Sequence, residues 1–119
     1  MPDKNLLETF ENPRPGREYT IEIIAPEFTS VCPITGQPDF GSIIVHYIPD
    51  KICVELKSFK LYIFSFRNEG AFYETIVNQM LDDLVALLNP IKIEVVGEFT
   101  PRGGISTNVS AIFTQENSD

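Results

Sequence analysis

The longest periodic stretch of the chain is residues 71–88, Ala-Phe-Tyr-Glu-Thr-Ile-Val-Asn-Gln-Met-Leu-Asp-Asp-Leu-Val-Ala-Leu-Leu. Its apolar side chains recur at the spacing of one face of an α-helix. That face consists of Phe72, Ile76, Val77, Met80, Leu81, Leu84, Leu87 and Leu88, with Glu74, Asn78 and Asp82 on the opposite face. Asn89-Pro90 ends the pattern. The stretch therefore predicts an amphipathic helix that needs a partner layer to pack on.

The segments on either side of this helix are predicted to form four strands, and the sheet that they make is the partner layer. They are residues 19–25, 42–48, 91–100 and 104–114, each rich in alternating or β-branched residues. Pro26 ends the first strand and Pro49-Asp50 the second. The last two form an antiparallel hairpin around residues 101–104, Pro-Arg-Gly-Gly, and Gly97 predicts a bulge.

Residues 57–67 are ambiguous between the two periodicities. Aromatic residues favour a strand, but Phe59, Tyr62, Ile63 and Phe66 fall at helical spacing, and we predict a helix that ends at residues 68–70. Residues 1–18 contain Pro13, Pro15 and Gly16 in a polar setting and predict an arm without regular structure, with at most one helical turn at 6–8. Residues 19–119 then form one α+β domain, a four-stranded antiparallel sheet with two helices on one face.

Size, composition and charge limit the function. A chain of 119 residues, 43% hydrophobic and 22% charged, suits one globular domain. A net charge of −8 opposes binding to nucleic acid or to an anionic membrane, so we expect a small-molecule substrate. No apolar run reaches the length of a membrane span, and residues 1–5 lack the form of a signal peptide, which predicts a cytoplasmic protein. The open sheet edges predict a homo-oligomer.

Metal chemistry is not expected, because one histidine and two cysteines have no zinc-ligand spacing. His46 alternates with apolar neighbours and is expected to be an ordinary strand residue. Cys53 lies in an apolar segment and is expected to be a core residue. Both cysteines are expected to be reduced in a cytoplasmic chain.

The segment 27–41 connects the first two predicted strands and holds Cys32 and Asp39. A loop of this length without secondary structure tends to be functional. A cysteine becomes a nucleophile as its thiolate, and Asp39 is the candidate acid/base group beside it. On spacing alone, however, Cys32 is better interpreted as a small buried residue and Asp39 as a turn residue.

Lys57 and Lys60 are three residues apart in the helix predicted for residues 57–67. Two ammonium groups on one helical face can grip a phosphate, and free N–H groups at a helix start would add to the attraction. On spacing alone, the pair is better interpreted as a solvated basic face beside Glu55.

Four motifs together resemble one enzyme family. They are the cysteine loop with Pro33 and Asp39, Glu-Leu-Lys-Ser-Phe-Lys-Leu-Tyr at 55–62, Phe-Ser-Phe-Arg-Asn-Glu-Gly at 64–70 and Phe-Thr-Pro-Arg-Gly-Gly-Ile-Ser at 99–106. From residue 19 to residue 108 the chain resembles the short, single-domain NADPH-dependent 7-cyano-7-deazaguanine reductases of queuosine biosynthesis. The resemblance implies the tunnelling fold, whose protomers close into two stacked rings with active sites between subunits.

The resemblance also implies roles for individual residues in a nitrile reduction that yields 7-aminomethyl-7-deazaguanine. Cys32 matches the nucleophile that forms a covalent thioimide, and Asp39 matches the proton donor. The implied contacts to the deazapurine substrate are Val54, Glu55, Leu56, Tyr73 and Glu74, with Glu74 on the guanine-like edge. The implied contacts to NADPH are Lys57, Ser58, Lys60, Tyr62 and Arg102, with both lysines on the phosphates.

The chain departs from the family at Tyr73, where histidine is common. A tyrosine can stack or donate a hydrogen bond but cannot relay a second proton near neutral pH, so we expect substrate positioning to differ. Glu74 also has a structural interpretation, because an acid in the first turn of a helix is stabilised by the helix dipole. Two other functions stay open: an amidine-forming relative that acts on nitrile-bearing tRNA without NADPH, and a non-catalytic purine- or pterin-binding ring protein.

Overall fold

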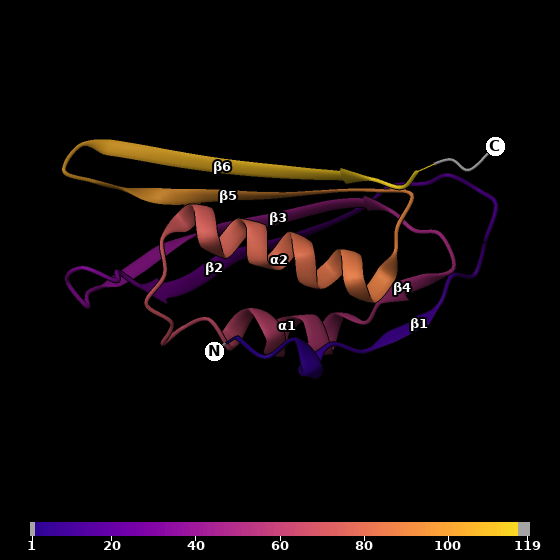
Figure 1. The fold of residues 1–119 in the computed structure, drawn as a ribbon, viewed down its shortest axis with the longest axis horizontal. Helices are drawn as coiled ribbons and strands as arrows, with labels where there is room; N and C mark the ends of the chain where they lie inside the picture. Colours follow the sequence, from indigo (N-terminus) through magenta and orange to yellow (C-terminus); the bar gives the residue numbers. More distant parts are fainter. Residues whose placement is uncertain (1, 117–119) are drawn as a thin grey trace.

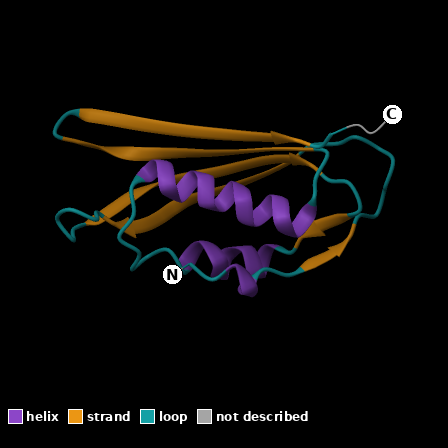
Figure 2. Ribbon diagram, viewed as in Figure 1, coloured by secondary structure: helices purple, strands orange, loops and turns teal. Residues whose placement is uncertain are grey.

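The fold is an antiparallel sheet with two helices packed on one face (Figures 1 and 2). The computed structural model describes residues 2–116. Its main elements are β2 (Ile21–Val31), β3 (Pro38–Ile48), α1 (Leu56–Phe64), α2 (Tyr73–Leu88), β5 (Lys92–Arg102) and β6 (Ile105–Thr114). The four long strands lie in the order β2-β3-β5-β6 and every neighbouring pair is antiparallel. The predicted α+β class is confirmed.

The core lies between the sheet and the helices. Alternate residues of the two central strands face it, namely Ile43, Val45, Tyr47, Ile93 and Val95, and each is at most 2% exposed. Helix α2 covers them with Ile76, Val77, Met80, Leu81, Leu84 and Leu88, all buried. The period-2 pattern of the strands and the 3.6-residue pattern of the helix thus meet in one apolar layer.

Both predicted helices are confirmed. Helix α2 ends at Leu88 and is capped by Asn89, which adopts the left-handed conformation with φ 40° and donates its N–H to Val85 O. Helix α1 buries Phe59, Tyr62 and Ile63. The helical spacing in this segment was the decisive signal, because the aromatic residues point to the core from a helix rather than a strand.

The predicted hairpin of β5 and β6 is confirmed, but its predicted bulge is misplaced. Gly103 and Gly104 adopt φ values of 58° and 80°, as a two-residue hairpin turn requires. The β3–β5 and β5–β6 registers run through Gly97 without a break, and the irregularity lies between Phe99 and Arg102. A Cβ atom at Gly97 would lie 2.8 Å from Val77 Cγ2, so glycine is needed there for close packing of α2 on the sheet.

The predicted long cysteine loop is wrong. Strand β2 continues past Pro26 to Val31, and β3 already begins at Pro38, so the connection is residues 32–37. The register of the pair shifts between Ala25 and Phe28. Pro26 is accommodated in this irregularity on an edge strand, where its missing N–H breaks no ladder bond. Asp39 therefore lies on a strand and not in a turn.

The predicted lack of regular structure in residues 1–18 is also wrong. A 3₁₀ turn covers Lys4–Leu6, and β1 (Thr9–Glu11) pairs antiparallel with β4 (Ile52–Val54) in a separate two-stranded sheet. Three-residue strands are too short to show a periodicity, so neither was predicted. Within the described residues, no helix is both long and apolar enough to cross a membrane.

Candidate active site

Cys32 lies immediately after β2, in a turn that its own backbone closes. Its N–H donates to Gln37 O over 2.8 Å, and its carbonyl accepts from Gly36 N over 2.9 Å. The segment before α2 ties this turn down, because Val31 N donates to Glu69 O at 2.9 Å and Ala71 N donates to Val31 O at 3.2 Å. These two bonds join the end of β2, where the turn begins, to the segment that leads into α2.

The turn surrounds the Cys32 sulfur with hydrogen-bond donors. The hydroxyl and the N–H of Thr35, together with the N–H of Ile34, lower the pKa of the Cys32 thiol below its ordinary value. Partial burial and the Asp39 carboxylate raise the pKa, by smaller amounts. The thiol is partly exposed and not in a disulfide. This is the environment of a reactive cysteine rather than of the small core residue that spacing alone favoured.

Thr35→Val tests this environment. Loss of the hydroxyl removes the largest influence that lowers the Cys32 pKa, so the thiolate forms at higher pH. We expect the pH profile of iodoacetamide alkylation to move to higher pH, and alkylation at neutral pH to slow several-fold. Cys53 is 1% exposed and should not react. Thr20→Val, at an exposed threonine, is the control; equal profiles for both variants would remove Thr35 from this role.

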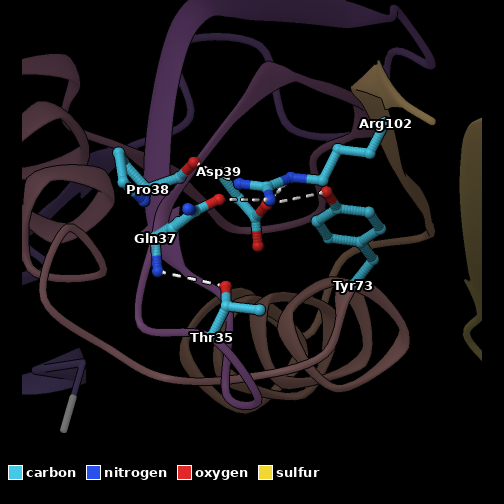
Figure 3. A network of polar contacts seen from close by, with 6 residues as sticks. All are labelled: Thr35, Gln37, Pro38, Asp39, Tyr73 and Arg102. Atoms are coloured by element: carbon cyan, nitrogen blue, oxygen red, sulfur yellow. Dashed lines mark hydrogen bonds and ion pairs between the residues drawn. The ribbon is translucent and has the colours of Figure 1, made fainter.

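Asp39 is the second residue of β3, and its side chain is only 5% exposed. Two groups hold its Oδ1 atom: Arg102 Nε at 2.7 Å and the Tyr73 hydroxyl, which donates at 3.1 Å (Figure 3). A buried carboxylate needs such partners, because an unpaired charge away from water is costly. The β5–β6 hairpin, β3 and the start of α2 thus converge on one acid.

Tyr73 is fixed by stacking as well as by its hydrogen bond. Its ring lies parallel to Phe99, with centroids 3.8 Å apart and planes at 5°. Burial and the hydrogen bond to Asp39 raise the pKa of Tyr73, so its hydroxyl stays protonated near neutral pH. Glu74 follows in the first turn of α2 and is exposed. Cys32, Asp39, Tyr73, Glu74 and Arg102 therefore belong to elements that meet at one end of the protomer (Figure 1).

The residues around the start of α1 lie toward the other end, beside β4 (Figure 1). Val54 is 3% exposed and Leu56 is 61% exposed. The Glu55 carboxylate accepts from Lys57 N at 2.6 Å and from Ser58 N at 2.9 Å, and these N–H groups lower the pKa of Glu55. The N–H groups that we expected to attract a phosphate are therefore occupied by Glu55, which caps the helix.

Of the four predicted cofactor contacts on α1, two lie in positions that fit. Lys57 and Lys60 are exposed and form no ion pair with a described side chain. Tyr62 is 0% exposed and its hydroxyl donates to the buried Asp83 at 2.5 Å. Ser58 is 2% exposed and its hydroxyl donates to Glu55 O at 2.8 Å. The burial of Tyr62 and Ser58 does not fit a direct contact with the cofactor. This burial results from the packing of α1 in the folded chain and is not evident from residue type.

The sequence of the chain matches one family of known proteins. The model of the family described as QueF-like protein matches residues 38–118. A protein of Chlorobium chlorochromatii, named NADPH-dependent 7-cyano-7-deazaguanine reductase, is 60% identical and the match covers 93% of this chain and 96% of the relative. A Rhodopirellula baltica protein of the same name is 54% identical, with 95% and 93% covered. The chain belongs to the QueF-like family.

A solved structure agrees with the fold. The crystal structure of the archaeosine synthase QueF-Like in the apo form matches with a TM-score of 0.74 over 83% of this chain and 96% of that chain. The identity is 23%, so this likeness concerns the fold alone, and it confirms the predicted tunnelling fold. By sequence identity the chain is instead similar to proteins that are named NADPH-dependent 7-cyano-7-deazaguanine reductase.

Three further features near the QueF-like site were not predicted. Thr35 hydrogen-bonds to Cys32, Phe99 stacks on Tyr73, and Ser30 lies directly opposite Asp39 in the β2–β3 pair. Among the described residues, the Ser30 hydroxyl is the buried side-chain group that lacks a hydrogen-bond partner. Correct strand bounds would have pointed to Ser30, because residues 30 and 39 then lie directly opposite each other on one face of the β2–β3 pair.

The other cysteine and the histidine are structural. Cys53 is buried and free, and His46 lies on β3 with its ring between Glu22 of β2 and Glu94 of β5, as expected for a strand residue. No group of histidine, cysteine and acidic side chains that could hold a metal ion occurs within residues 2–116.

Proposed function

We propose that this chain reduces the nitrile of 7-cyano-7-deazaguanine to the aminomethyl group with NADPH, in queuosine biosynthesis. The supporting observation is a thiol with lowered pKa, in a turn whose donors favour the thiolate, near a carboxylate buried at the end of the adjoining strand. Such a thiolate is the nucleophile that a weakly electrophilic nitrile carbon requires. The substrate is proposed from the two relatives, 60% and 54% identical to this chain, whose names specify reduction of 7-cyano-7-deazaguanine.

Covalent bond formation begins at Cys32. The thiol gives its proton to the Asp39 carboxylate, and the sulfur electron pair forms a bond to the nitrile carbon. One C–N π bond breaks, and its electrons go to the nitrogen, which takes the proton back from Asp39. The product is a neutral thioimide, and the proton balance needs no other group.

Glu74 is proposed to bind the guanine-like edge of the substrate. Its carboxylate is exposed in the first turn of α2, directly after the Tyr73 that contacts Asp39. A carboxylate can accept two hydrogen bonds from a guanine edge. Val54, Glu55 and Leu56 are proposed to contact the same base from another protomer, with exposed Leu56 as the side chain in position to do so.

The outer face of α1 fits an anionic cofactor. Lys60 and Leu56 line a groove of about 380 Å³ between α1 and β2, together with the exposed side chains of Ile24 and Phe64. Ammonium groups of Lys57 and Lys60 would hold the phosphates and the apolar groove the remainder. Reduction of a nitrile to a primary amine takes two hydrides, and NADPH supplies them when it is bound.

The proposed site combines residues that lie too far apart in one protomer to meet, which supports a site shared between copies of the chain. In one protomer, the cysteine turn and the start of α1 lie toward opposite ends of a molecule 47 Å long (Figure 1). Both edge strands, β2 and β6, are long and free to pair with another copy. We propose a homo-oligomer, two stacked rings as the family resemblance implies, in which each active site joins the cysteine end of one subunit to the lysine face of its neighbour.

Mixed assemblies test this arrangement. We expect Cys32→Ala and the double variant Lys57→Ala/Lys60→Ala each to lack nitrile-dependent NADPH oxidation. Co-expressed with two tags and purified through both, they should regain activity, because roughly one quarter of sites then combine two intact halves under random mixing. Cys32→Ala mixed with Asp39→Asn is the control and should stay inactive, since both lesions lie at the same end. Activity in neither mixture would place the whole site within one subunit.

The same assay separates the proposed function from its alternatives. A reductase oxidises NADPH when the nitrile is added, whereas an amidine-forming enzyme and a non-catalytic binding protein do not. The acidic charge of −8 supports a small-molecule substrate over tRNA. A cytoplasmic location is part of the proposal, supported by two free cysteines, which suit a reducing compartment.

A further inference from the structure

Arg102 was expected to contact the cofactor, but the structure directs its guanidinium elsewhere. Nε lies 2.7 Å from Asp39 Oδ1, Nη2 donates to Pro38 O at 2.5 Å, and Nη1 donates to Gln37 Oε1 at 3.4 Å. All three nitrogens of the fork are therefore used by residues 37–39, at the junction of the cysteine turn and β3 (Figure 3).

The contacts on Asp39 are unequal between its two oxygens. Arg102 and the Tyr73 hydroxyl both bind Oδ1. Within the described residues, Oδ2 has no hydrogen bond or ion pair. An oxygen that already accepts from two donors is a poor proton acceptor, and its partner atom keeps its lone pairs available.

We propose that Arg102 is a positioning residue for proton transfer, which with Tyr73 anchors Oδ1 so that Oδ2 exchanges the proton with Cys32 and the substrate nitrogen. This inference rests on the proposed function and deepens it. Arg102 fixes the carboxylate by a planar two-point grip on Asp39 and Pro38, and Tyr73 prevents rotation about the carboxylate axis. The hairpin turn brings Arg102 to this place, so the tip of β5–β6 belongs to the acid/base machinery.

Thioimide formation in the absence of NADPH isolates this role. A residue that contacts the cofactor affects KM for NADPH and leaves the rate of thioimide formation unchanged, whereas a residue that positions Asp39 does the reverse. We expect Arg102→Gln to slow thioimide formation about 10- to 100-fold, with KM for NADPH changed by less than about two-fold. Arg102→Lys, which keeps the charge but not the fork, should fall between Arg102→Gln and the unmodified protein.

Controls keep the outcome interpretable. Arg17→Gln removes an exposed arginine elsewhere and should behave as the unmodified protein. Tyr73→Phe removes one donor to Oδ1 while keeping the stacked ring, and should slow thioimide formation about five-fold. This variant serves as the test if Arg102→Gln does not assemble by size-exclusion chromatography.

Three outcomes are distinct. Slow thioimide formation with unchanged KM supports the positioning role. Thioimide formation by Arg102→Gln at the unmodified rate, or a raised KM for NADPH as its sole effect, overturns it; so does an unchanged rate in Tyr73→Phe where that variant is the test. Absence of a thioimide in the unmodified protein would instead contradict the proposed function.

Discussion

Cys32→Ala is expected to abolish both nitrile-dependent NADPH oxidation and the covalent adduct with the nitrile. Alanine has no nucleophile, and the donors of the turn then have no thiolate to stabilise. Because the Cys32 backbone bonds to Gln37 and Gly36 do not involve the side chain, the fold of the turn should persist. Initial rates of NADPH oxidation and intact-protein mass spectra measure the two effects.

The matched control is Cys53→Ala, since Cys53 is the other cysteine of the chain and lies in the core. Loss of its buried thiol should cost about 1 kcal/mol of stability and leave turnover within about two-fold. An adduct that persists in Cys32→Ala and disappears in Cys53→Ala would reverse the assignment of the nucleophile.

Asp39→Asn is expected to slow thioimide formation about 10²- to 10⁴-fold, the usual contribution of a general acid/base. The asparagine carbonyl can still accept from Arg102 and Tyr73 at the position of Oδ1, but the amide nitrogen in place of Oδ2 can neither take nor return the proton. Stopped-flow or quenched mass spectrometry at saturating nitrile gives the rate.

The fold of this variant must be checked because Asp39 is buried and ion-paired. The asparagine leaves Arg102 without its charged partner, so a loss of stability of about 1–3 kcal/mol is expected in urea unfolding at fixed protein concentration. Asp82→Asn, on the exposed face of α2, is the control and should change neither quantity. Full thioimide formation by Asp39→Asn would remove Asp39 from the mechanism.

The sequence predicts the elements that are long and periodic, for identifiable reasons. Helix α2 carries sixteen residues whose apolar stripe matches a helix throughout, and the β5–β6 hairpin has a two-glycine turn between long alternating strands. These predictions hold in the folded protein because the local conformational preference and the burial of apolar residues favour the same structure. Strands β1 and β4, with three residues each, offer no period and exist through pairing with one another.

In the cysteine segment, the strands were predicted correctly but their end residues were not. Pro26 breaks the alternating pattern of β2, but the edge position lets the strand continue through an irregular register to Val31. The short turn that results, and not a long loop, brings Thr35 within hydrogen-bond reach of the Cys32 thiol. Helix α1 is a second example, because it exposes Lys60 and buries Tyr62. Both residues belong to the same sequence motif, and the motif alone does not tell which of them is exposed.

The candidate site was predicted mainly through family resemblance, since the spacing of Cys32 and Asp39 alone favoured structural roles. Residue types alone did not predict which side chains contact one another. The pairing of Arg102 with Asp39 depends on β5 lying beside β3, and the occupation of the α1 N–H groups depends on Glu55. Both are contacts of the folded chain, and both change the role expected of a residue.

The most direct test of covalent catalysis is the intact mass of the protein after mixing with 7-cyano-7-deazaguanine in the absence of NADPH. The proposed mechanism predicts a mass increase equal to that of the nitrile, located by peptide mapping to the segment that contains Cys32, and lost when NADPH is added. An unmodified mass in a preparation that oxidises NADPH with the nitrile would contradict a covalent thioimide at Cys32.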